Sequence, residues 1–323
     1  MLSQDEFLHS SQLARMGRPL PGAHRFFNDR LSLTVLDREA NIFGINHIQV
    51  STNRGFARFR SVFSVDGDSV SYANRSTIDG QQLTFEKLSD GHMSYQVVEP
   101  LKKVRVTFDG PQYAFDLTYE GRAAAFDFDD CLEGHPLGGA QTTGGHYEQA
   151  VTCRGEFEVR RGPRKGERRA VNCLANRNHT WDFRYGDKAV WDMAPGEHRW
   201  PTIYLPERHF GFYIGQGRGA EYGRLHEGGY LGTPVRNRSL RRINLNVDMA
   251  EGRVARAFQC VLTLPNREVF RIHTTRSYGQ LQLPMYGEDD KEVCLDCHYD
   301  FFDVELEDMG ENGTAVYEHS YFA

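Results

Sequence analysis

KKVRVTFDGPQYAFDLTYEG, residues 102–121, shows the clearest β-strand pattern in the sequence. Apolar side chains alternate with polar ones on both sides of its centre, at Val104, Val106, Phe108, Tyr113, Phe115, Leu117 and Tyr119. The tetrapeptide DGPQ, residues 109–112, separates the two runs and has the composition of a turn. Two runs of period two joined by a short turn predict an antiparallel β-hairpin.

The same alternation recurs along most of the chain, for example in RLSLTVLD (30–37), HFGFYIGQGRG (209–219), RINLNVDMAEGRVARAFQCVLTL (242–264) and GTAVYEHSYFA (313–323). EFEVRRGPRKGERRAV (156–171) predicts two strands joined by a basic loop. Many short strands with glycine-rich turns indicate an all-β sandwich or barrel architecture.

The strands form two blocks, and the segment between them is rich in glycine and acidic residues. We therefore predict a first β domain with its connector over 25–145 and a second over 146–323. Residues 1–24 are expected to form a short N-terminal helix and a linker, because Ser3 and Glu6 have the spacing of a capping box.

The overall composition narrows the class of protein. With 323 residues, 39% hydrophobic and 25% charged, the chain has the composition of a soluble globular protein. A net charge of -6 argues against nucleic acid as a partner, since neutralising phosphates needs a basic surface. No apolar run approaches the ~20 residues of a membrane span, and the N-terminus is acidic where a secretory signal is basic. We expect a cytoplasmic protein with reduced cysteines.

Three short motifs suggest cofactors, but their context favours structural roles. CLDCH (294–298) has the spacing of a haem attachment site, yet it lies in a strand-like run and lacks a second ligand pair for zinc. GQGRG (215–219) is not followed by an amphipathic helix, so it fits a turn better than a nucleotide site. RRGPRKGERR (160–169) fits a solvated hairpin loop. We expect neither a metal nor an organic cofactor.

Two neighbouring segments gather polar and aromatic side chains. In NCLANRNHTWDFR (172–184), a strand would place Arg177, His179 and Trp181 on one face. In HYEQAVTCRGEFEV (146–159), His146 and Glu148 would share one face, and Tyr147 would share the other with Gln149. An imidazole beside an aromatic wall suits proton transfer on an apolar substrate. The same pattern also fits a buried histidine and a core tryptophan, and the residues alone leave both interpretations open.

The sequence resembles a bacterial family of lipocalin-like, AttH-type proteins related to the carotenoid 1,2-hydratases. The resemblance covers most of the chain, including residues 27–67, 100–121 and 144–159, and the C-terminal strand. Its most specific part is RNHTWDFR (177–184), which is similar to the family signature R-D-H-S-W-G-x-R. Asn178 and Asp182 depart from that signature. The resemblance implies two consecutive lipocalin-like β-barrels or half-barrels. It also implies an enzyme that adds or removes water at carbon–carbon double bonds of apolar molecules without an organic cofactor.

These observations lead to one leading hypothesis about function: a cofactor-independent lyase, hydratase or isomerase that acts on an isoprenoid, steroid or phenolic molecule. His179 would be the general acid or base, with Glu148, His146 or Glu318 as its complement. The residues expected to bind substrate are Trp181, Arg184, Tyr147, Asn178 and Tyr321. The alternatives are a carrier of apolar ligands without catalysis and a metal enzyme that uses His146, Glu148 and His179. Exposed strand edges would favour a homodimer.

Overall fold

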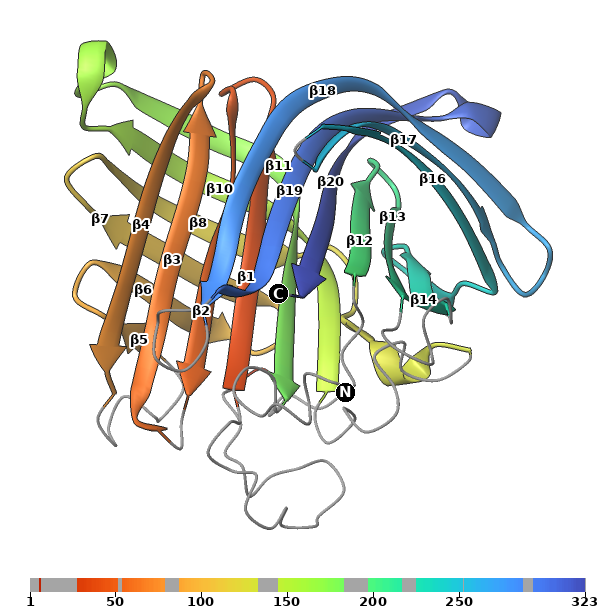
Figure 1. Ribbon diagram of the computed structural model, residues 1–323, viewed down its shortest axis with the longest axis horizontal. Coiled ribbons are helices and arrows are strands. Elements are labelled where there is room, and N and C mark those ends of the chain that lie inside the picture. Colours follow the sequence, from red (N-terminus) through yellow and green to blue (C-terminus); the bar gives the residue numbers. More distant parts are fainter. Residues whose placement is uncertain are drawn as a thin grey trace. The chain divides into compact units, whose positions relative to one another are not determined.

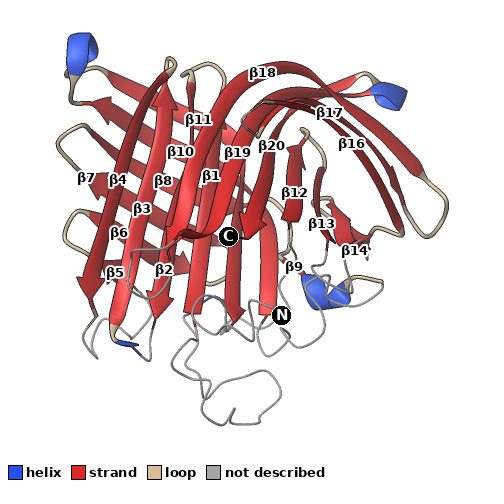
Figure 2. Cartoon of the chain, viewed as in Figure 1, coloured by secondary structure: helices blue, strands red, loops and turns tan. Residues whose placement is uncertain are grey.

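The protein is described by a computed structural model, which covers residues 6, 28–51, 54–78, 87–132, 145–182, 197–216, 225–251, 253–286 and 293–322. Strands make up almost all of these ranges, and no α-helix is present within them (Figure 2). Three short 3₁₀ helices complete the described part: η5 (Phe128–Asp130), η6 (Gly162–Arg164) and η8 (Glu307–Met309). The predicted N-terminal helix lies outside the described residues, apart from Glu6.

The chain divides into two compact units, each built on one antiparallel sheet. The first unit comprises Met1–Ala125 and Thr143–Phe183, and the second comprises Phe126–Thr142 and Arg184–Ala323. This division differs from the expected boundary at residues 145/146. The segment after that boundary returns to the first sheet, because its two long strands pair with strands formed by the beginning of the chain.

The first sheet has the order β4-β3-β2-β1-β11-β10-β8-β7-β6-β5. Its strands are β1 (Asn28–Asp37), β2 (Ile42–Ser51), β3 (Phe56–Val65), β4 (Asp68–Thr77), β5 (Lys87–Ser89), β6 (Met93–Glu99), β7 (Lys103–Asp109), β8 (Tyr113–Gly121), β10 (Gly145–Val159) and β11 (Arg168–Asp182). The sheet curls into a half-barrel (Figure 1). The hairpin predicted over 102–121 is confirmed as β7 and β8, and its alternating apolar side chains are buried in the core.

The second sheet has the order β15-β14-β13-β12-β20-β19-β18-β17-β16, and it also curls into a half-barrel. Its strands are β12 (Glu197–Tyr204), β13 (His209–Gln216), β14 (Leu225–Gly232), β15 (Asn237–Ser239), β16 (Arg242–Ala250), β17 (Val254–Thr263), β18 (Val269–Tyr286), β19 (Val293–Leu306) and β20 (Glu311–Phe322); the short strand β9 (Phe126–Asp127) belongs to the same unit. Phe210, Phe258, Phe302 and Tyr317 are among the buried residues of its core. Two antiparallel half-barrels are the lipocalin-like architecture that the sequence predicted.

The register of three neighbouring strands positions the polar residues of the first unit. His179 on β11 lies opposite Leu31 on β1 and opposite Tyr147 on β10. Because side chains alternate between the faces of a sheet, His179 shares its face with Arg177 and Trp181. This is the face that carries the hydrophobic core, so these polar groups lie inside the half-barrel.

Candidate active site in the first half-barrel

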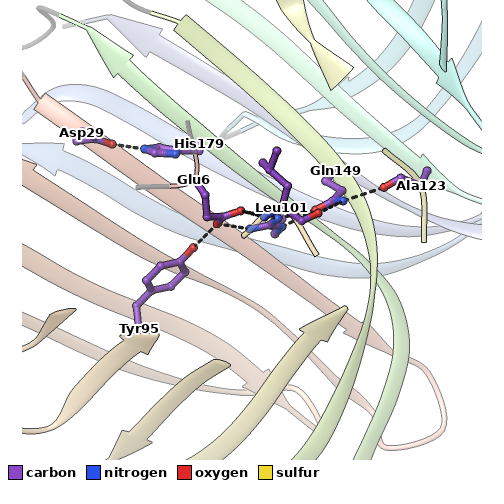
Figure 3. A network of polar contacts seen from close by, with 8 residues as sticks. Glu6, Asp29, Tyr95, Leu101, Ala123, Gln149 and His179 are labelled. Atoms are coloured by element: carbon purple, nitrogen blue, oxygen red, sulfur yellow. Dashed lines mark hydrogen bonds and ion pairs between the residues drawn. The ribbon is translucent and has the colours of Figure 1, made fainter. Parts of the chain in front are cut away.

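A histidine–carboxylate pair lies inside the first half-barrel. The Nε2 atom of His179 is hydrogen-bonded to Oδ1 of Asp29, and both side chains are at most 1% exposed (Figure 3). A carboxylate on one ring nitrogen fixes the orientation and tautomer of the imidazole. The other nitrogen, Nδ1, is then the atom suited to proton transfer.

Two aromatic rings surround this imidazole. The rings of Trp181 and Tyr147 lie edge-on to His179, with centroids 5.1 Å and 5.4 Å from that of the imidazole. Trp181 can lie across the start of β10 because its cross-strand neighbour is Gly145, where a Cβ atom would collide with the indole ring. Burial, with the carboxylates of Glu6 and Asp29, raises the pKa of Tyr147 well above its usual value, so its hydroxyl is protonated at neutral pH.

An ion pair lies on the same face of the sheet, and its arginine is two residues from His179 along β11. Arg177 forms two hydrogen bonds to the carboxylate of Glu6, of 2.5 Å and 2.9 Å. Glu6 also accepts hydrogen bonds from the hydroxyl of Tyr95 (3.1 Å) and the backbone N–H of Leu101 (2.6 Å) (Figure 3). Gln149 accepts a 2.8 Å hydrogen bond from Nε of Arg177 and so fixes the guanidinium from the other side.

This second pair is almost completely buried. The Arg177 and Glu6 side chains are 3% and 0% exposed. Burial opposes the charge of Arg177, but the carboxylate of Glu6 favours it, and the pKa of the guanidinium is raised. Removing one partner from such a pair leaves an uncompensated buried charge. Arg177 and Glu6 therefore form a rigid support beside Tyr147, whose ring lies 5.8 Å from the guanidinium carbon.

His146 and Glu148 lie on the opposite face of the sheet from His179. The predicted pairing of these two residues on one face is present, with Nε2 of His146 3.6 Å from Oε1 of Glu148. Asn178 is the cross-strand neighbour of Glu148 and shares that face. The expectation that His146 or Glu148 complements His179 is therefore wrong for this strand register, because adjacent residues of β10 and β11 point to opposite faces. The same geometry rules out the metal site of His146, Glu148 and His179.

The face of the first sheet that carries His146 also holds a second buried histidine, which is surrounded by arginines. His47 on β2 is the cross-strand neighbour of Arg60 on β3, and both are at most 5% exposed. Burial and then Arg60, Arg30 and Arg58 lower the pKa of His47 well below its usual value. The imidazole of His47 is therefore neutral at neutral pH.

The remaining predicted site residues lie elsewhere. Glu318 and Tyr321 belong to β20 of the second unit, at an odd spacing that places them on opposite faces of that strand. Glu318 pairs with Nε2 of His198 at 3.3 Å. Arg184 lies outside the described residues, so its predicted role is neither supported nor contradicted.

The structure also bears on cofactors and membranes. Within the described ranges, no group of three or more His, Cys, Asp or Glu side chains is arranged to hold a metal ion. The CLDCH segment lies in β19, where the side chain of Cys297 is buried. Among the helices described, none is long and apolar enough to cross a membrane.

Sequence reasoning missed three residues of this site: Asp29, Tyr95 and Glu6. Asp29 was within reach of the pattern, because it continues the period-two series of Leu31, Leu33 and Val35. Glu6 was assigned to a helix cap, and nothing in its local sequence signals a contact with Arg177, which is 171 residues away.

Comparison with known proteins places the chain in a family. The profile described as "Domain of unknown function (DUF7064)" matches residues 15–321, so the chain belongs to that family. No curated protein sequence matches the chain significantly.

Solved structures with the same fold include three of high coverage. An AttH-type protein from Nitrosomonas europaea is 10% identical, with a TM-score of 0.69, and the match covers 100% of this chain and 97% of that one. CghA in complex with Sch210972 is 9% identical, with a TM-score of 0.65 and coverage of 93% and 89%. Kievitone hydratase from Nectria haematococca is 15% identical, with a TM-score of 0.59 and coverage of 98% and 93%. The architecture is thus that of AttH-type and hydratase proteins, in agreement with the resemblance seen in the sequence.

Proposed function

We propose that the protein is a cofactor-independent lyase or hydratase that acts on a hydrophobic small molecule, with His179 as the group that transfers the proton. The observation that carries this proposal is the buried pair of His179 and Asp29 between two aromatic rings. The fold shared with kievitone hydratase supports a reaction that adds or removes water.

The proposed chemistry needs only one imidazole. In the direction of dehydration, Nδ1 of His179 takes a proton from carbon, and the imidazolium is stabilised by Asp29 on Nε2. The same proton then passes to the departing hydroxyl, so that water leaves and a carbon–carbon double bond forms. Loss of formaldehyde from a hydroxymethyl group would use the imidazole in another order: Nδ1 takes the hydroxyl proton, the carbon–carbon bond breaks to release formaldehyde, and the proton returns to the carbon left behind. Isomerisation would use Nδ1 to take a proton from one carbon and return it to another. A positioned acid–base group of this kind contributes about 10²–10⁴-fold to a rate.

The surroundings of His179 suit an apolar substrate that bears one oxygen. The Trp181 ring supplies an apolar wall, and the protonated hydroxyl of Tyr147 is a donor for a substrate oxygen. The ion pair of Arg177 and Glu6 would hold Tyr147 in place without neutralising Asp29, because Arg177 is already paired. An isoprenoid alcohol, a steroid or a phenolic aromatic has this combination of an apolar body and a single oxygen.

A ligand screen followed by product analysis tests the proposal. Purified protein is screened by thermal shift with isoprenoid alcohols, sterols and phenolic aromatics, including kievitone, and every stabilising compound is incubated and analysed by mass spectrometry and chromatography. We expect at least one compound to gain or lose the mass of one water or to lose the mass of formaldehyde. The His179→Ala variant should lower that turnover by about 10²–10⁴-fold.

A matched variant separates catalysis from folding. His92 is an exposed histidine of the same unit, and His92→Ala should leave turnover unchanged. If every stabilising compound emerges unchanged by both readouts, the protein is a carrier of apolar ligands and His179 is part of its core. A loss below tenfold in a folded His179→Ala protein would remove His179 from the reaction.

A further inference from the structure

The second half-barrel contains a cavity, open to solvent on one side, that the proposed reaction does not use. Its volume is about 660 Å³, within the usual range of about 300–1,000 Å³ for small-molecule sites. Apolar residues from several strands contribute to its lining: Ile214, Ile243, Leu245, Cys260, Val261 and Ile272. Four charged residues line it as well: Glu197 and Arg199 on β12, Arg271 on β18 and Glu307 in η8.

Of the two arginines that line this cavity, Arg199 is the less exposed, because the side chain of Arg271 is 51% exposed and pairs with Asp308 at 3.2 Å. The side chain of Arg199 is 34% exposed, and its Nε atom donates a 2.9 Å hydrogen bond to Glu197. Burial opposes its charge, but the carboxylate of Glu197 favours it and the pKa of the guanidinium is raised, so Arg199 is a full cation. Glu197 is itself 25% exposed, and ion pairs that remain open to solvent are weak. The guanidinium therefore keeps the capacity to bind a second anion.

Two ionisable residues on the neighbouring strands, His319 and Asp300, do not neutralise the charge of Arg199. His319 on β20 is the cross-strand neighbour of Arg199, and Nε2 of His319 lies 3.8 Å from Oδ2 of Asp300 on β19. Burial raises the pKa of Asp300 to about 7 and lowers that of His319 to about 3. The amide of Gln280 donates to Asp300 at 3.0 Å. Because His319 is neutral and Asp300 is only partly ionised at neutral pH, the positive charge of Arg199 is opposed mainly by Glu197.

We propose that this cavity is a binding site for an apolar small molecule that carries one anionic oxygen group, a phenolate, enolate or carboxylate, with Arg199 as the residue that recognises the anion. The apolar lining takes the body of the ligand, and the guanidinium fixes its orientation. Phenols of Tyr317 and Tyr321 lie on the same face of β20 as His319, and burial is the main cause that keeps both protonated. They supply neutral donors rather than competing anions. This site is independent of the proposed reaction at His179.

The proposal is tested with two isosteric probes, 2-naphthoate and the neutral 2-naphthamide, by calorimetric titration of the full-length protein at neutral pH. We expect the wild type to bind the carboxylate at least tenfold more tightly than the amide, since a hydrogen bond to a charged group is worth about that much. Arg199→Gln should remove this discrimination while leaving the affinity for the amide unchanged. Arg199→Lys should retain part of it.

Control variants identify the location of the site. Arg256→Gln removes an equal charge from an exposed position of β17 that does not line the cavity, and it should not alter either affinity. Ile214→Trp fills the cavity and should abolish binding of both probes. His179→Ala should leave both affinities unchanged, so failure of the reaction and failure of this site are separate results. The proposal is overturned if a folded Arg199→Gln protein still prefers the carboxylate, or if Ile214→Trp binds both probes normally.

Discussion

The two half-barrels bury ionisable side chains in opposite ways. In the first, Arg177 donates two hydrogen bonds to the carboxylate of Glu6, which also accepts hydrogen bonds from the hydroxyl of Tyr95 and the backbone N–H of Leu101. In the second, Asp300 and His319 are equally buried but 3.8 Å apart, and burial shifts both pKa values toward the neutral forms. The difference shows that geometry decides whether a buried pair keeps its charges: a bidentate contact compensates desolvation, and a longer one does not.

The largest effect should come from breaking the charged pair of the first half-barrel. Glu6→Ala leaves the guanidinium of Arg177 buried without its carboxylate, and we expect the free energy of unfolding to fall by about 3–5 kcal/mol. Urea denaturation followed by circular dichroism measures this. Glu39→Ala, which removes an exposed carboxylate of the same unit, should change it by less than about 0.5 kcal/mol.

The double variant Glu6→Ala, Arg177→Met sharpens this comparison. It removes both charges, so it should be more stable than Glu6→Ala alone, because an apolar replacement of a buried ion pair leaves no uncompensated charge. If the double variant is the less stable of the two, Arg177 is not destabilised by loss of Glu6 and the two residues are not an obligate pair.

A smaller effect is expected from the carboxylate that orients His179. Asp29→Asn keeps the shape of the side chain but removes the charge that favours the imidazolium. With the substrate found by the screen, turnover should fall by at least about tenfold, because the carboxylate holds a catalytic imidazole in the tautomer and orientation that the reaction needs. Since Asp29 acts through His179, the pH profile of turnover should also shift to lower pH, as the imidazole becomes harder to protonate. An unshifted profile would assign Asp29 a purely structural role.

The sequence predicted the fold better than it predicted the site. Period two in residues 102–121 and 242–264 placed hairpins where β7–β8 and β16–β17 occur, because alternation is a local property of the strand. The same rule correctly put Tyr147 with Gln149 and separated them from His146 and Glu148. Once Tyr147 lies opposite His179, the alternation of side chains places His146 and Glu148 on the other face of the sheet, where they cannot contact His179.

What the sequence did not contain was the strand order. Asp29 meets His179 only because β1 pairs with β11, 150 residues along the chain, and Glu6 meets Arg177 across an even larger separation. The same pairing explains why the division into units differs from the predicted boundary at 145/146. β10 and β11 belong to the first sheet and not to the second. Long-range pairing depends on the sum of many contacts, which no short motif encodes.

The most sensitive test of the comparison is the pH dependence of stability in the second half-barrel. Asp300, with a folded pKa of about 7, binds a proton in the native state that the unfolded chain has released above its ordinary pKa of 3.8. By itself it makes stability fall as pH rises from about 4 to 7. His319, with a folded pKa of about 3, lacks in the native state a proton that the unfolded chain holds below 6.5. By itself it makes stability rise with pH from about 3 to 6.5.

The two contributions cancel in the wild type, since between about pH 4 and 6.5 native and unfolded states hold one proton each on this pair. Single variants should expose them with opposite signs. Relative to the wild type, Asp300→Asn should gain stability as pH rises through this window, and His319→Gln should lose it, each by at most about 1.4 kcal/mol per pH unit. The other ionisable groups near the pair stay in place and cancel in the comparison: His198, His298, Asp296, Arg253, Arg199, Glu197, Tyr317 and Tyr321. Urea unfolding at pH 4.5, 5.5 and 6.5 measures the slopes, which we expect to be flat again in the double variant; equal slopes in both single variants would mean that Asp300 and His319 are charged in the folded protein, like Glu6 and Arg177.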